Sequence, residues 1–236
     1  MARGKLIVVE GTDKSGKETQ TTRLFNRLVA EGYKVARSDF PRYDTPSGRI
    51  IGQCYLGKDR WGEDKNWFGN ADGVDPKVAS LYYTADRRFN LPQLQKFLEE
   101  NDFVLLDRYG SSNMGHQGGK IRDPTKRAEF YRWLENLEYG MAELPKADLT
   151  LLLYMPWQVG RELAKGMSEK VDEHEKNEDH LRNAEEAYLQ LAQMYNWPKI
   201  DCTKEKTFES IKTRDEISEE VWQAVLSVFP YTFHRK

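Results

Sequence analysis

The chain has 236 residues, a formal net charge of −2 and 39% hydrophobic residues, and this length is typical of one large domain or two small ones. Aromatic residues make up 12% of the chain, which supplies enough apolar surface for a packed core and argues against an intrinsically disordered protein. The near-neutral charge argues against a general nucleic-acid binder, and the longest apolar runs are far shorter than the roughly 18 residues that a membrane span needs.

Strand-like segments recur along the chain. Residues 6–9, 103–106 and 149–153 are continuous apolar runs bounded by charged or turn residues. Such runs are typical of strands in a parallel sheet that is covered on both faces. Less continuous patterns at residues 34–39 and 199–202 predict two further strands.

Apolar residues at helical spacing lie between these strands. The first stripe, residues 24–29, ends at Gly32, which predicts a glycine C-cap. Similar stripes at residues 130–141, 187–194 and 217–228 predict further helices. The alternation of strands and helices predicts a three-layer α/β fold, with a parallel β-sheet flanked by helices.

One segment, at about residues 166–178, is charged and has few apolar residues, and it lies between two helices. It is either a solvated connection or a short mobile lid over a site. Its composition leaves both interpretations open.

The two cysteines, Cys54 and Cys202, have a spacing that suits neither a metal site nor a redox pair. We interpret them as two separate buried thiols. The N-terminus also lacks the apolar stretch and cleavage site of a signal peptide, so we expect a cytoplasmic protein. The chain has no repeat, low-complexity tract or long linker, so we expect one domain over residues 1–236.

The first predicted strand leads into a loop that matches G-x-x-x-x-G-K, and a predicted helix follows. In such a loop the glycines let backbone N–H groups converge on phosphate oxygens, and the lysine reaches the β and γ phosphates. The sequence therefore predicts a P-loop that binds a nucleoside triphosphate. The residues predicted to bind it are Gly11, Thr12, Asp13, Lys14, Ser15, Gly16, Lys17, Glu18 and Thr19.

Glu18 departs from the P-loop pattern, because a serine or threonine that ligates Mg²⁺ normally follows the lysine. A carboxylate is also a hard oxygen ligand, so Glu18 is a candidate Mg²⁺ ligand. It adds negative charge beside the triphosphate, however. A nucleotide-binding pseudokinase with impaired catalysis is therefore a second hypothesis.

Sequence motifs distinguish between two classes of nucleotide-binding enzyme, a GTPase and a kinase. Asp107-Arg108-Tyr109-Gly110 matches the D-x-x-G of GTPases, but the chain has no [NT]-K-x-D motif to read guanine. Arginines near predicted strand ends, or on a helix that faces them, instead favour a kinase, because their planar fork grips an acceptor phosphate. These arginines are Arg42, Arg87, Arg88 and Arg108.

The motifs together resemble the thymidylate kinase family. The resemblance runs from residue 5 to about residue 228 and implies a P-loop nucleoside monophosphate kinase that converts dTMP and Mg²⁺-ATP to dTDP and ADP, as a cytosolic homodimer. A kinase for another nucleoside monophosphate or deoxynucleotide remains the nearest enzymatic alternative. The matching segments are the P-loop with Thr19-Gln20, Phe40-Pro41-Arg42, Ala85-Asp86-Arg87, Asp107-Arg108-Tyr109 with Ser111-Ser112-Asn113, and Asp172-Glu173-His174-Glu175 in the lid.

The resemblance implies roles at the acceptor phosphate and at the metal. Arg108 and Arg42 are expected to hold the phosphate of dTMP, although the family's arginine can lie one residue further on, where this chain has Tyr43. Asp13 occupies the place of a carboxylate near the acceptor sugar and phosphate. Asp107 is expected to organise Mg²⁺ through water, or else to cap the adjacent loop.

Two lysines of the P-loop are expected to act on the donor. Lys17 should hold the β and γ phosphates, and Lys14 should supply charge to the transferring phosphoryl group. Relatives place that second charge on an arginine either in the P-loop after the aspartate or in the lid, and this chain has no arginine between residues 161 and 182. The alternative is that Lys14 is an exposed loop residue and that the charge comes from Lys165, Lys170 and Lys176.

On the base side, the resemblance implies that Tyr83 stacks on thymine and that Arg87 reads the base edge, since residues four apart share one helix face. Tyr83 could also be an ordinary core residue. His116 is expected near the ribose 2′ position. The implied dTMP-binding residues are Asp13, Phe40, Arg42, Tyr83, Arg87, Arg108, Ser112, Asn113 and His116; the implied catalytic residues are Lys17, Lys14, Asp13 and Arg108.

Overall fold

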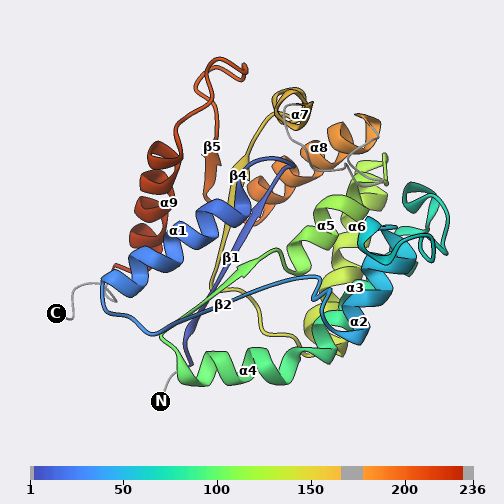
Figure 1. The fold of residues 1–236 in the computed structure, drawn as a ribbon, viewed down its shortest axis with the longest axis horizontal. Helices are drawn as coiled ribbons and strands as arrows, with labels where there is room; N and C mark the ends of the chain where they lie inside the picture. The colour runs from blue at the N-terminus through green and yellow to red at the C-terminus, as the bar shows by residue number, and fades with distance from the viewer. Residues whose placement is uncertain (1–2, 166–177, 231–236) are drawn as a thin grey trace.

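The structure, a computed structural model, describes residues 3–165 and 178–230 (Figure 1). The predicted lid therefore lies outside the described residues, apart from Glu178, which begins a helix. Lys170, Lys176 and the D-x-x-E element lie outside them as well.

Within the described residues, five parallel strands form one sheet in the order β2-β3-β1-β4-β5. All five predicted strands are present. Their bounds are β1 Lys5–Gly11, β2 Val35–Asp39, β3 Phe103–Asp107, β4 Leu149–Tyr154 and β5 Lys199–Asp201.

Successive side chains of β1 pack into hydrophobic cores on opposite faces of the sheet, which explains why the sequence of this strand does not alternate with polar residues. Ile7 and Val9 pack with residues of helices α1 (Lys17–Ala30) and α9 (Arg214–Val228) on one face. Leu6 and Val8 pack on the other face with α4 (Leu91–Glu100). Strands buried on both faces are expected to be apolar throughout. The structure places the C-cap of α1 at Glu31, and the predicted glycine, Gly32, follows it with φ +84°.

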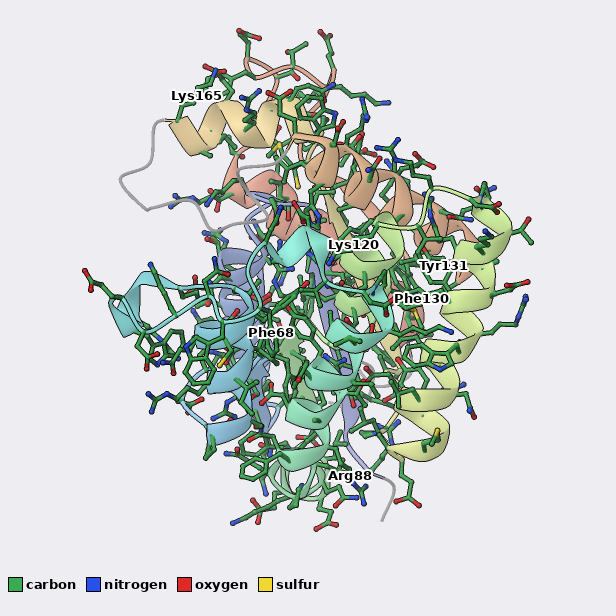
Figure 2. The ribbon with its side chains drawn as sticks, turned by 90° about the vertical axis from the view of Figure 1, so that its right-hand side faces the viewer. Phe68, Arg88, Lys120, Phe130, Tyr131 and Lys165 are labelled. Atoms are coloured by element: carbon green, nitrogen blue, oxygen red, sulfur yellow. The ribbon has the colours of Figure 1, made fainter. Side chains whose placement is uncertain are left out.

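The remaining helices lie on the right-hand side of the sheet in Figure 1 or continue from its carboxyl end. Phe130 and Tyr131, labelled in Figure 2, pack into a cluster formed by three of them, α5, α6 and α8. The bounds are α3 Pro76–Phe89, α5 Gly110–Gly119, α6 Pro124–Glu135, α7 Trp157–Lys165 and α8 Glu178–Met194, with the short turns α2 Pro46–Arg49, η1 Ile50–Tyr55, η2 Asp59–Trp61, η3 Ala71–Gly73 and η4 Asn136–Met141.

Helices α5 and α8 approach each other closely because α5 carries glycine where they meet. A Cβ on Gly115 would lie 2.5 Å from the ring of Tyr188, and one on Gly119 would lie 3.0 Å from the backbone of Asn183 and Ala184. This contact brings side chains of α8 beside the carboxyl end of the sheet.

Two other expectations can be compared with the fold. Cys54 and Cys202 are separate buried thiols, as predicted. Among the described residues, no helix is both long and apolar enough to cross a membrane.

Candidate active site

Two cavities lie at the carboxyl end of the sheet, where ligands of open α/β folds bind. One has a volume of about 280 Å³ and extends between the ends of β1 and β3 and helix α3. The other has a volume of about 290 Å³ and lies between the P-loop, α7 and α8. Both are lined by Asp13 and His116, so the cavities meet at these side chains. We call them the acceptor cavity and the donor cavity.

The P-loop connects β1 to α1 and is tied to the end of β4. Lys17 Nζ donates to the carbonyl oxygens of Gly11 and Thr12, each at 3.0 Å, and Thr12 Oγ1 donates to the Met155 carbonyl at 2.6 Å. Burial, reinforced by Arg108, lowers the pKa of Lys17 to about 8. Lys17 is therefore a buried cation at neutral pH, held at the start of a helix.

Three further P-loop residues differ in their exposure and in whether they line a cavity. Lys14 has φ +59° and lines the donor cavity. Ser15 Oγ is buried and makes no hydrogen bond within residues 3–165 and 178–230. Glu18 is exposed in the first turn of α1 and lines neither cavity.

Asp13 and Arg108 form an ion pair at the junction of the cavities, with 3.6 Å between Oδ1 and Nη2. Burial alone would raise the pKa of Asp13, but nearby positive charge, including that of Lys17 and Arg108, lowers it to about 2. Burial opposes the charge of Arg108, yet Tyr188, Asp13 and Asp107 raise its pKa above the usual range. Both groups therefore carry full charge at neutral pH.

Arg108 is also unusual in its backbone, which has φ +67° directly after β3. This left-handed conformation is costly for a residue other than glycine and is concentrated at functional sites. It turns the arginine toward both Asp13 and His116, whose Nε2 lies 3.0 Å from Arg108 Nη1.

Asp107 ends β3 and lines the acceptor cavity. Its Oδ1 atom is buried and has no hydrogen-bond partner in the described part of the chain. Such an oxygen suits a hard cation. In that same part, no group of three His, Cys, Asp or Glu side chains is arranged to hold a metal ion. The residues therefore fit a magnesium ion that arrives with a nucleotide rather than a built metal centre.

Most residues expected to bind dTMP do line the acceptor cavity. Two buried amide oxygens also lie there without a hydrogen-bond partner among the described residues, Asn113 Oδ1 and Gln117 Oε1. Gln117 was missed from the sequence, because glutamine carries no motif of its own. The expected residues that line the cavity are Asp13, Phe40, Tyr83, Arg87, Arg108, Ser112, Asn113 and His116.

Arg42 is the exception, because it does not line the acceptor cavity. Its guanidinium group instead bonds Asp44 at 3.1–3.2 Å, Ser38 Oγ at 2.9 Å and Gln93 at 3.2 Å. The expectation that Arg42 holds the acceptor phosphate therefore has no support in this geometry. Lys58, which the sequence did not single out, lines the cavity instead.

Arg87 lies in the cavity wall but is already held by a carboxylate. Its Nε donates to Glu138 Oε2 at 2.8 Å, and its Nη2 contacts Glu138 Oε1. Both side chains are almost fully buried, and Thr84 Oγ1 donates to the same carboxylate at 2.7 Å. Glu138 fixes the orientation of Arg87, and its distance of 51 residues along the chain left no local signal for this pair.

A second buried carboxylate, Glu10, orders the loop after β3. It accepts hydrogen bonds from the backbone N–H of Tyr109, from Ser111 Oγ, from Ser112 Oγ and from Tyr188 Oη, at 2.6–3.2 Å. The Ser112 hydroxyl is therefore directed to Glu10, although Ser112 lines the cavity.

The comparisons of the sequence and of the structure with known proteins all identify the same family. The sequence matches the family model described as thymidylate kinase over residues 9–213. It is 28% identical over 220 residues to the thymidylate kinase of Homo sapiens, which covers 91% of each chain. It is 29% identical over 229 residues to that of Halothermothrix orenii, over 94% of this chain and 97% of the relative. The solved thymidylate kinase of Candida albicans has the same fold, with a TM-score of 0.70 at 24% identity, over 100% of this chain and 95% of that one.

Proposed function

The chain belongs to the thymidylate kinase family, and we propose that it transfers the γ-phosphoryl group of ATP to dTMP, giving dTDP and ADP. The observation that carries this proposal is the meeting of the two cavities at Asp13 and His116, beside Lys14 of the P-loop. Phosphoryl transfer needs a donor and an acceptor in line, and it depends on positioning and charge neutralisation more than on covalent chemistry.

On the donor side, the P-loop backbone and Lys17 would hold the β and γ phosphates. Lys14 lines the donor cavity and directly follows Asp13, where the two cavities meet, which supports its assignment to the transferring group. Asp107 would hold the magnesium ion of Mg²⁺-ATP, since its carboxylate oxygen is buried and unpaired within the described residues. Glu18 is left out of this assignment because it is exposed and lines neither cavity.

On the acceptor side, Arg108 would hold the phosphate of dTMP together with Lys58, which lines the same cavity. An oxygen of that phosphate attacks the γ-phosphorus while the bond to the β–γ bridging oxygen breaks, and ADP leaves with the released charge. The cations lower the barrier by neutralising phosphate charge in the transition state.

The base would lie between Tyr83 and the polar wall of the cavity. Thymine offers one N–H donor between two carbonyl acceptors. Asn113 Oδ1 can accept from the N–H, and Arg87, held in place by Glu138, can donate to a carbonyl. A purine lacks this pattern, so we propose a pyrimidine acceptor.

A coupled ADP-release assay with dTMP, dUMP, dCMP, dAMP and dGMP tests the proposal. We expect the highest kcat/KM with dTMP and a strict requirement for Mg²⁺. If ATP binds but no monophosphate stimulates ADP release, the protein is a nucleotide-binding pseudokinase. If dAMP is used as well as dTMP, the assignment of the base wall is wrong.

We also propose two properties of the whole protein. The two separate buried thiols favour a reducing, cytoplasmic location. Exposed apolar residues along α3, which include Val78, Leu81 and Phe89, favour a homodimer built on that helix.

A further inference from the structure

Three side chains from separate elements connect Arg108 to the surface turn η3. His116 Nε2 lies 3.0 Å from Arg108 Nη1, and His116 Nδ1 lies 3.4 Å from His180 Nε2. His180 Nδ1 lies 3.0 Å from Asp72 Oδ1. The connection therefore runs from Asp72 in η3, through His180 in α8 and His116 in α5, to the arginine that follows β3.

The groups at the two ends of this connection determine which atom donates and which accepts in each hydrogen bond. The Arg108 guanidinium can only donate, and the Asp72 carboxylate can only accept. Each of these three contacts is satisfied when Arg108 donates to His116 Nε2, His116 Nδ1–H donates to His180 Nε2, and His180 Nδ1–H donates to Asp72. Both imidazoles are then neutral, and both carry their proton on Nδ1.

The packing holds this arrangement in place. The two imidazole rings lie edge to edge, with 5.7 Å between their centroids and 8° between their planes, and Tyr188 packs edge-on against His116 at 5.6 Å. His180 is buried. Lys120 Nζ fixes the turn that carries Asp72 by donating to the Ala71 and Val74 carbonyls, at 2.7 and 3.2 Å.

We propose that Asp72, His180 and His116 act as positioning residues that hold the Arg108 guanidinium in its orientation toward the acceptor phosphate. This inference rests on the proposed function of the acceptor cavity. Arg108 Nη1 is held by His116 while Nη2 faces Asp13, so two contacts set the plane of the guanidinium. Because His180 lies on α8, the same contacts link acceptor binding to that helix.

The arrangement is sensitive to protons. A proton on His116 Nε2 would face the N–H of Arg108, and a proton on His180 Nε2 would face the N–H of His116, so either protonation breaks the connection. Acid is therefore expected to weaken dTMP binding. Within residues 3–165 and 178–230, the ionisable groups that face the imidazoles or Asp72 are Arg108, Asp13, Tyr188 and Lys120, and Asp75 acts on Lys120.

The first test removes the acceptor at the far end. Asp72→Leu should raise the Kd and KM for dTMP about tenfold, the value of one hydrogen bond to a charged group, while the KM for ATP changes little. Asp72→Asn retains an acceptor oxygen and should restore most of the affinity at pH 8. His180→Phe retains an aromatic ring at this place but loses both nitrogens, and it should behave like Asp72→Leu. Glu63→Leu removes an exposed carboxylate close by in the chain and is the matched control.

The second test uses protons. Because the connection is already broken in His180→Phe, the loss of dTMP affinity at acid pH should be smaller in this variant than in the wild-type protein. In ¹⁵N spectra of the wild-type protein above this transition, both imidazoles should be protonated on Nδ1. A purely structural role for these residues would not produce this dependence of dTMP affinity on pH.

The outcomes separate this inference from the proposed function. If the wild-type protein neither binds nor phosphorylates dTMP, the function is wrong, and the ¹⁵N spectra still decide the positions of the protons. An Nε2–H tautomer at either histidine would overturn the inference. So would effects of Asp72→Leu and His180→Phe on dTMP affinity that are no larger than that of Glu63→Leu.

Discussion

Lys58 and Arg60 lie two residues apart and both face the ring of Tyr43, at 5.0 and 5.2 Å, but only Lys58 lines the acceptor cavity. Removing a cation that binds phosphate should weaken the acceptor without affecting the donor. We expect Lys58→Ala to raise the KM for dTMP about tenfold or more, the value of one charge-assisted contact, and to leave the KM for ATP nearly unchanged. Steady-state kinetics with Arg60→Ala as the control check this expectation. Equal effects of the two substitutions would exclude Lys58 from the phosphate site.

Lys14 and Lys165 both line the donor cavity, but Lys165 is paired with Glu162 at 2.7 Å at the end of α7 (Figure 2). A group that stabilises charge in the transition state acts on kcat more than on KM. We expect Lys14→Ala to lower kcat on the order of 10²–10³-fold, by analogy with other preorganised charge-stabilising groups. Lys165→Ala should remain near the wild-type rate. A large loss of kcat in Lys165→Ala together with a small one in Lys14→Ala would reverse the assignment.

Lys17 makes the reaction sensitive to alkaline pH. Burial lowers its pKa to about 8, so the charged form that binds phosphate is lost in the free protein as the pH rises through that value. We expect kcat/KM for ATP to fall above about pH 8. An arginine stays protonated in this range, so the residual activity of Lys17→Arg should not show this fall. A wild-type profile that stays flat to pH 10 would contradict the assignment.

The candidate site residues whose place in the fold could be predicted from the sequence are those that directly follow a buried strand. The P-loop and Asp107-Arg108 follow buried strands, so their places at the carboxyl edge follow from a parallel sheet. Arg42 does not line the cavity, because a residue beside a strand end can turn either way, and here Asp44 and Gln93 hold it away. Partners that are distant in sequence, such as Glu138 for Arg87, depend on tertiary packing that no local pattern records.

At the scale of elements, strands were predictable because both faces of the sheet are buried, and helix α5 was not. Four of its ten residues are glycine, which disfavours an isolated helix. Packing against α8 overrides that preference, because only glycine permits the close approach. The predicted helix over residues 130–141 also divides, since α6 ends at Glu135 and a π-helical turn follows. That turn carries the buried Glu138, and π-helical turns are frequent at functional sites.

The contact between α5 and α8 can be tested through Gly115. A Cβ there would lie 2.5 Å from the buried ring of Tyr188, whose hydroxyl donates to Glu10. We expect Gly115→Ala to lower the free energy of unfolding by about 1–3 kcal/mol, as overpacking of a core does, despite the higher helix propensity of alanine. Chemical denaturation measures the change. Gly73→Ala is the control, because a Cβ at Gly73 meets nothing within 4 Å. Stabilisation by Gly115→Ala would show that the helices can separate at no cost.

At the scale of the whole molecule, α3 separates the acceptor cavity from an exposed apolar surface. Tyr83 and Arg87 line the cavity, whereas Val78, Leu81 and Phe89 are 43%, 50% and 58% exposed. Figure 2 looks onto this side, with Arg88 labelled near the end of the helix. The exposed residues recur at helical spacing and form a stripe. Two copies related by a twofold axis could bury this stripe against itself, which is the common way that identical chains associate.

A charge in that stripe should therefore separate the copies. We expect the wild-type protein to sediment as a dimer and Leu81→Glu to sediment as a monomer, because two carboxylates would be buried near the twofold axis without partners. Met141→Glu is the control, since Met141 is 72% exposed on the separate turn η4. The monomer should also have a higher KM for dTMP than the control, because α3 would lose the support that holds Tyr83 and Arg87 against the base. A monomeric wild-type protein, or a dimer that Leu81→Glu leaves intact, would exclude this face as the interface.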